Sequence, residues 1–184
     1  DGVLHIHDLQ PFGDSSPSQG LSVDGGFVVA ASDGTGRQLA KLDYNGGHQW
    51  LTSLTREGTT TPVSVMAPAF GIQQLGDIIV FDAVHRGADA TLFGYTLTTG
   101  VVEELSTNIL APGHSNEVVS DGTTIWFDCV LGHTGMELCQ TDGTVSGTAL
   151  TIDLMPGIST SQPRSMAYVD STLYVLAQGL DDLS

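Results

Sequence analysis

A four-strand pattern recurs along the chain at nearly constant spacing, and this spacing limits the folds that the sequence can adopt. The second strand of each round is a short apolar run that ends in a small residue. These runs begin at Phe27, Ile79, Ile125 and Leu173, at intervals of 52, 46 and 48 residues. A leucine also recurs at one position of the third strand, at Leu39, Leu92 and Leu138. We call such an equivalent position of the aligned repeats a column.

Turn residues separate the apolar runs. Asp33-Gly34-Thr35 and Asp142-Gly143-Thr144 suit tight corners, because glycine adopts positive φ cheaply and aspartate can bond to its own backbone. No segment carries a sustained helical stripe of apolar residues with caps. A repeat of about 45–50 residues with four short strands has the spacing of propeller blades. The sequence therefore predicts an all-β fold, a β-propeller-like array of four-stranded antiparallel blades with about 3.5 blades in this chain.

The whole chain, 1–184, is predicted to form a single β-propeller or part of a larger one. The expected blades are residues 10–54, 55–106, 107–154 and 155–184, with an N-terminal strand over 3–9. That strand is of the fourth type and could complete the final blade. The final blade would still lack its third strand, so we expect the chain to belong to a larger assembly.

The charge balance restricts the partners. Five Lys and Arg stand against 21 Asp and Glu, which gives a net charge of −16. Such a chain repels nucleic acid and anionic membrane surfaces. No apolar run approaches the roughly 18 residues of a membrane span. We expect a protein partner or further blades of the same assembly, with no nucleic acid and no membrane insertion.

Residues 135–148 read Gly-Met-Glu-Leu-Cys-Gln-Thr-Asp-Gly-Thr-Val-Ser-Gly-Thr. This stretch resembles a bacterial propeller repeat of the type Glu-Leu-Trp-x-x-Asp-Gly-Thr, with Cys139 in place of the tryptophan. The tail Asp153-Leu154-Met155-Pro156-Gly157 resembles the tail of the same repeat. The resemblance is specific over one repeat and implies blades of a secreted or surface-attached protein. We therefore expect an extracellular or cell-surface location, although this chain shows no signal peptide.

Cys129 and Cys139 are the only cysteines. A three-residue loop, 133–135, would place them directly opposite each other on two paired strands, within disulfide range. A four-residue loop, 132–135, would instead put them on opposite faces. They could also remain two buried free thiols. We favour the disulfide among these three arrangements.

His5 and His7 lie two apart and so share one face of the expected strand. Such a pair can ligate a metal, but the aligned positions of the third round are Leu150 and Ile152, which favours structural histidines packed against a neighbour. Asp-Gly-Thr turns offer oxygens to calcium, yet none matches the spaced aspartate loop of known calcium sites. We therefore predict no cofactor and keep calcium and a histidine-bound metal as alternatives.

The chain carries no nucleophile elbow, phosphate loop or paired acid–base motif. This pattern favours a non-catalytic extracellular propeller module for protein–protein contact, adhesion or scaffolding. The alternative is an enzyme or enzyme subunit with a metal site near the His5/His7 strand. The sequence names no ligand-binding residues for either function.

Overall fold

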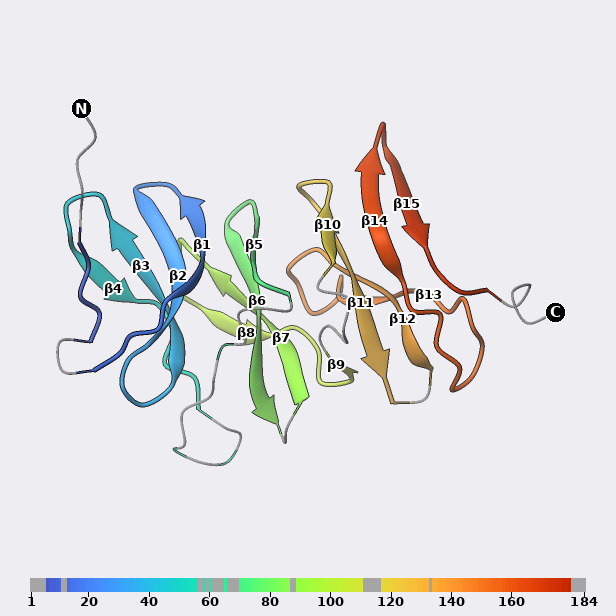
Figure 1. Cartoon of the computed structure of the whole chain (residues 1–184), viewed down its shortest axis with the longest axis horizontal. Coiled ribbons are helices and arrows are strands. Elements are labelled where there is room, and N and C mark those ends of the chain that lie inside the picture. The colour runs from blue at the N-terminus through green and yellow to red at the C-terminus, as the bar shows by residue number, and fades with distance from the viewer. Residues whose placement is uncertain are drawn as a thin grey trace.

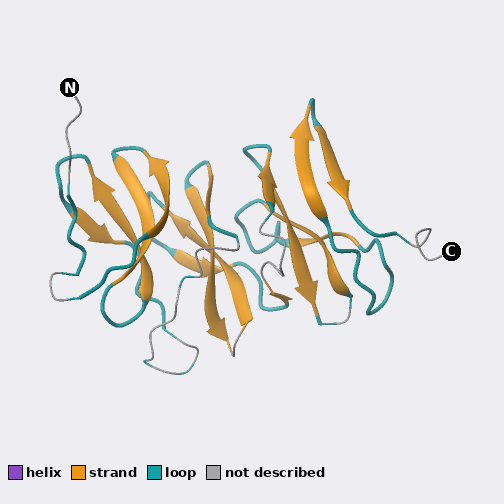
Figure 2. Ribbon diagram, viewed as in Figure 1, coloured by secondary structure: helices purple, strands orange, loops and turns teal. Residues whose placement is uncertain are grey.

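The computed structural model describes residues 6–10, 13–55, 58, 60, 65, 70–86, 89–110, 117–132 and 134–179. These residues form fifteen strands and no helix (Figure 2). All strand pairs are antiparallel, and the strands form successive four-stranded sheets. The all-β, blade-like fold expected from the repeat is therefore confirmed.

Each sheet is built from strands that follow one another along the chain. The first sheet has the order β1 (Ser18–Val23), β2 (Gly26–Ser32), β3 (Arg37–Asp43) and β4 (His48–Trp50). The second has the order β5 (Ile72–Leu75), β6 (Ile78–Arg86), β7 (Asp89–Thr96) and β8 (Val102–Glu104). The third has the order β10 (Val118–Ser120), β11 (Ile125–Leu131), β12 (Gly135–Thr141) and β13 (Ala149–Ile152), with β9 (Ile109–Leu110) also pairing with β11. The last hairpin pairs β14 (Arg164–Val169) with β15 (Thr172–Leu176).

The sheets stand side by side in a row, in chain order, with the first sheet at one end and the last hairpin at the other (Figure 1). Strand β1 contacts β5, and β10 contacts β14. First strands of neighbouring sheets therefore approach one another, as the inner strands of propeller blades do.

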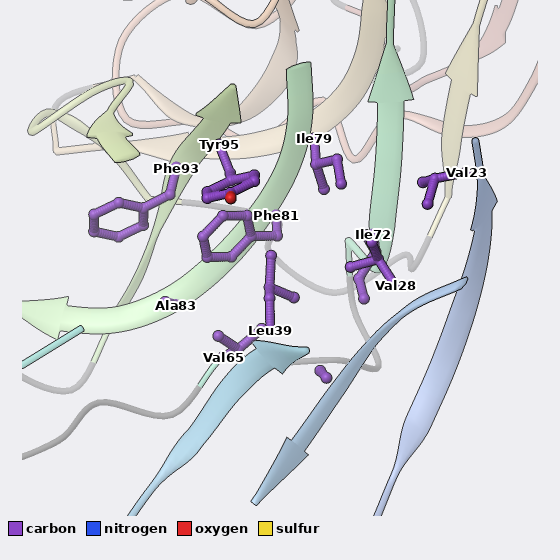
Figure 3. Close-up of a cluster of buried hydrophobic side chains, with 11 residues drawn as sticks. Val23, Val28, Leu39, Val65, Ile72, Ile79, Phe81, Ala83, Phe93 and Tyr95 are labelled. Atoms are coloured by element: carbon purple, nitrogen blue, oxygen red, sulfur yellow. The ribbon is translucent and has the colours of Figure 1, made fainter. Parts of the chain in front are cut away.

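The first and second sheets enclose one apolar core. Val28 and Leu39 of the first sheet meet Ile79, Phe81 and Ala83 of β6, all with no exposed surface. Figure 3 shows Leu39 and Phe81 pointing toward each other. The Phe81 and Phe93 rings stack with centroids 5.8 Å apart. Alternate residues of β2 and β6 thus supply the surface that joins these two sheets.

The other face of the second sheet packs against the third. Val80 and Leu92 lie there with Phe127 and the two cysteines in a second apolar core. Strand β6 is therefore buried on both faces, which explains its nearly continuous apolar sequence. On the far side of the third sheet, Trp126 stacks on Tyr168 of β14, with ring centroids 5.4 Å apart. The Met166 N–H also donates to the Glu117 side chain at 3.1 Å. Aromatic stacking and a hydrogen bond therefore both join the last hairpin to the third sheet.

Two expected strands differ from the structure. The sequence pattern alone predicts that the first strand of the second round ends near Val65–Met66. In the structure this strand is β5, and Val65 makes only an isolated bridge to Ala83. Gly76, at φ 55°, allows the tight turn that pairs β5 with β6. The N-terminal strand over 3–9 is absent from its described part, residues 6–9. Leu9 packs on Ala31 and Ala40 of the first sheet, at the opposite end of the row from the last hairpin, and does not complete it (Figure 1).

In the first and third sheets, a buried polar side chain near the start of the third strand binds the segment that leaves the sheet. In the first sheet, the Gln38 side-chain oxygen accepts from Thr52 Oγ1 and the Leu54 N–H at 2.8 and 2.9 Å. In the third sheet, Glu137 accepts from the Leu154 and Ser161 N–H groups at 2.9 and 3.1 Å. Gln38 and Glu137 occupy the same column of the repeat, and we call this arrangement the crossover clamp. It supplies acceptors for backbone N–H groups of the segment that follows the fourth strand.

Removing the Glu137 clamp is expected to destabilise the fold. Glu137→Ala leaves the Leu154 N–H without its acceptor and removes one of the two acceptors of the Ser161 N–H, which also donates to the Met136 carbonyl. The loss should cost about 1–3 kcal/mol of unfolding free energy. Glu137→Gln keeps an acceptor oxygen, as Gln38 does in the first sheet, and should cost clearly less. Urea denaturation measures both, with the exposed Glu103→Ala as the matched control. Equal losses for Glu137→Ala and Glu103→Ala would contradict the clamp.

Candidate functional site

The histidine pair is only partly within the described residues, because His5 lies outside them. His7 is half-buried at the first sheet and its Nδ1 is buried without a hydrogen-bond partner. It lies near Asp43, whose pKa is lowered first by N–H bonds from Gly47 and Asn45 and to a smaller extent by the nearby His7. Among the described residues, no group of three or more His, Cys, Asp or Glu side chains is placed to hold a metal ion. A metal at His5 and His7 therefore remains only a hypothesis.

The Asp-Gly-Thr turns share one hydrogen-bonding pattern. Asp121 Oδ1 accepts from the N–H groups of Thr123 and Thr124 at 2.8 and 2.7 Å. Asp142 Oδ1 accepts from both the Thr144 hydroxyl and its N–H. These bonds hold the pKa of both carboxyl groups below the usual value. Turn hydrogen bonding therefore accounts for the position of these carboxylates without a bound calcium ion.

Cys129 and Cys139 are joined by a disulfide, with Cα atoms 5.8 Å apart. Neither expected loop forms, since Leu131 pairs with Gly135 and only residues 132–134 lie between the strands. In this register Cys139 opposes Phe127, and Cys129 opposes Glu137. The cysteines are therefore diagonal neighbours on one face of the sheet, the face that packs against the second sheet. The expectation of direct opposition was wrong, and the twisted sheet still brings the diagonal pair within bonding range.

Asp82 is an acid inside the protein. It is 1 % exposed on β6, beside the core between the second and third sheets, and its Oδ1 has no hydrogen-bond partner. Burial raises its pKa to about 7. Asp128 occupies the same column in β11 and is fully buried. This column thus places carboxyl groups between neighbouring sheets.

A polar cleft of about 580 Å³ lies between the first and second sheets. Its lining residues are Asp24, Lys41, Gln49, Leu51, Gln74, Gly76, Asp77, Tyr95, Leu97 and Thr98. Lys41, the only lysine of the chain, donates to the Asp24 carbonyl at 2.8 Å, and the Thr98 hydroxyl donates to Asp77. The lining includes no histidine, serine or cysteine, the usual members of a nucleophile–base pair. The cleft can admit a small polar molecule, and each of its two walls contains a hydrogen bond within its own sheet.

The two ends of the row expose apolar side chains. On the last hairpin, Val169, Tyr174 and Leu176 are 52, 59 and 63 % exposed. On the first sheet, Phe27 and Tyr44 are 43 and 54 % exposed and meet edge to face, with ring centroids 5.7 Å apart. Exposed apolar surface of this kind often marks a protein–protein contact. These end faces are the described surface best suited to binding another protein.

The end face of the last hairpin was not predicted from the sequence, although the sequence carries a signal for it. Leu173-Tyr174-Val175-Leu176 is apolar at every position, which is typical of a strand covered on both faces. In the structure Leu173 and Val175 are half-buried, whereas Tyr174 and Leu176 are exposed. The polar cleft has no such signal, because its residues come from two sheets that are distant in sequence.

The fold has relatives among solved structures. A mutant puromycin hydrolase complexed with PGG superposes with a TM-score of 0.58 at 16% identity, over 87% of this chain and 25% of that chain. A puromycin-hydrolyzing peptidase of Mycobacterium tuberculosis gives 0.56 at 16% identity, over 84% and 24%. TolB from Acinetobacter baumannii gives 0.44 at 16% identity, over 81% and 34%. The chain thus spans about a quarter of the length of the hydrolase and of the peptidase.

These neighbours are propeller-type structures, and at this identity the likeness shows the fold alone. No protein-family model matches the chain, and no curated protein matches it by sequence. The described residues also contain no helix that is long and apolar enough to cross a membrane.

The disulfide is expected to be present in native protein and to stabilise it. It closes a loop with a sequence separation of 10 residues. The chain-entropy account gives about 3 kcal/mol for a loop of this size. Replacing both cysteines with alanine should lower the unfolding free energy by about that amount, measured by urea denaturation without reductant. Labelling of both thiols by iodoacetamide in unreduced protein unfolded in urea would show that the link is absent.

Asp82 is expected to make stability fall as pH rises. Its carboxyl group has a pKa of about 7 in the fold and about 3.9 in the unfolded chain. Its stabilising contribution is therefore complete below about pH 4 and is lost as pH rises through about 7, by about 1.4 kcal/mol per unit within that window. Asp82→Asn should flatten this dependence in urea titrations between pH 5 and 8, and the exposed Asp170→Asn should not. Parallel curves for wild type and Asp82→Asn would contradict this assignment.

Proposed function

We propose that the chain is a non-catalytic propeller module that mediates protein–protein contact outside the cell, in adhesion or scaffolding. The observation that carries this proposal is the exposed apolar face of the last hairpin, with Val169, Tyr174 and Leu176 all more than half exposed. Burying such side chains in a contact gains about 25 cal/mol per Å² of apolar surface before the costs of association. The propeller-type fold supplies a rigid base for this face.

The extracellular location is supported by the Cys129–Cys139 disulfide. Disulfides persist in oxidising compartments and are rare in the cytosol. The resemblance of residues 135–148 to repeats of secreted and surface-attached propellers supports the same location.

The test compares partner capture by matched variants. Immobilised wild-type chain should retain a protein from the extracellular fraction of its source, and a variant with Tyr174→Glu and Leu176→Glu should lose it. Val101→Glu adds the same kind of charge at a site 56 % exposed on the turn before β8 and should retain the partner. Equal capture by all three proteins, or robust hydrolase or oxidoreductase turnover by the purified chain, would overturn the proposal.

A further inference from the structure

The polar cleft between the first and second sheets lies next to the apolar core that joins them. Lys41 pairs with Val28 and with Gln49. Opposed residues share one face of a sheet, and this is the face toward the second sheet, where Val28 is buried. On the facing sheet Tyr95 pairs with Ile79, and both belong to the core of Figure 3. Polar side chains beside an apolar core are the arrangement found in many small-molecule sites.

The repeat fills the equivalent place between the second and third sheets with backbone. Gly94 of the second sheet occupies the column of Lys41. Gly143 of the third sheet occupies the column of Leu97. A Cβ atom on Gly94 would lie only 3.2 Å from the Gly143 carbonyl oxygen, so the two sheets are in close contact there. The cleft is therefore particular to the first pair of sheets, where longer side chains line an open space.

The polar groups of the cleft keep hydrogen-bonding capacity for a ligand. The Lys41 ammonium has three donors, of which the Asp24 carbonyl accepts one at 2.8 Å. The Asp77 carboxylate accepts from Thr98 through Oδ2, which leaves Oδ1 to accept from another group. Among the described residues, the exposed side chains of Asp24 and Gln49 make no hydrogen bond. The walls thus offer donors and acceptors together.

Charge limits the class of ligand. Asp24 and Asp77 place two carboxylates beside one ammonium, in a chain of net charge −16, so an anion is repelled. An organic cation would meet the Lys41 ammonium on the same walls. In the part of the chain that the structure describes, no group of three or more His, Cys, Asp or Glu is placed to hold a metal ion. A neutral molecule with several hydroxyl groups fits best, because every hydroxyl both donates and accepts.

We infer that the cleft binds a neutral carbohydrate. Neighbouring sugar hydroxyls would donate to the carboxylates and accept from Lys41, and the C–H face of the ring would lie on Leu51 and Leu97. These leucines are half-buried and pack against the core. The volume of about 580 Å³ is typical of small-molecule sites, which span roughly 300–1,000 Å³. This inference is independent of the proposed contact function, which rests on the last hairpin.

The test uses the only lysine of the chain as a reporter. Isotope-labelled lysine gives NMR side-chain signals from Lys41 alone. The neutral probes are glucose, galactose, N-acetylglucosamine, cellobiose and maltose, each titrated to about 20 mM, well above the Kd of a millimolar site. At least one of them should shift the Lys41 signal to saturation. Lack of a saturable shift with all five overturns the inference.

A matched pair of variants assigns the binding to the cleft. Gln49→Ala removes one hydrogen-bonding side chain and should weaken the binding about fivefold. Glu103→Ala is the control and should bind like wild type, because Glu103 occupies the column of Gln49 in the second sheet but lies on the face toward the third. Both positions are exposed on outer strands, and circular dichroism checks that both variants are folded. Equal affinities of Gln49→Ala and wild type would overturn the assignment to this cleft.

Glucuronate tests the charge argument, because it carries a carboxylate where glucose has a hydroxymethyl group. It should bind more weakly than the best neutral sugar. Tighter binding of glucuronate than of every neutral probe would overturn the neutral class. None of these titrations involves the last hairpin, and the capture experiment does not involve the cleft. Failure of the carbohydrate site and failure of the contact function are therefore distinguishable.

Discussion

Apolar packing between neighbouring sheets is the interaction on which this structure depends. Strand β6 directs Ile79, Phe81 and Ala83 toward the first sheet and Val80 toward the third. A strand with apolar side chains on both faces is stable in water only between two other layers. The sheets must therefore follow one another in a row, and the order of the chain sets the order of the sheets. Among the described residues, the first sheet and the last hairpin have a neighbouring sheet on one side only, and both expose apolar side chains.

A row of sheets also needs a way to bring the chain back from the fourth strand of one sheet to the first strand of the next. The motif Gly-x-Glu-Leu at residues 135–138 serves this crossing. A Cβ at Gly135 would come within 2.3 Å of the Ser159 carbonyl oxygen, so only glycine lets the returning segment approach. Glu137 then binds the Leu154 and Ser161 N–H groups, and Leu138 enters the sheet as a buried side chain. In the second sheet the equivalent residue is Thr91, whose buried hydroxyl has no hydrogen-bond partner. The crossover clamp is therefore missing from the second sheet.

The sequence predicted the strands and the cysteine pair because both depend on local pattern. Alternation and Asp-Gly turns identified β2, β6, β11 and β12 from short-range information alone. The register between β11 and β12 was not predictable, because loops that differ by one residue share the same turn residues and move every opposed pair. The sequence pattern also predicted the wrong position for strand β5. Residues 63–66 and residues 72–75 fit a short strand equally well by composition. The polar cleft and the exposed end faces depend on how sheets stack, which no single repeat encodes.

The strongly acidic composition gains a physical role from this architecture. An all-β chain with exposed apolar ends and a strand edge at β15 presents surfaces that promote uncontrolled aggregation. A net charge of −16 opposes close approach of copies in most orientations. Arg164 pairs with Leu176 in the last hairpin, so one of the few cations of the chain lies next to an exposed leucine. The net charge therefore opposes the association that the exposed apolar side chains favour.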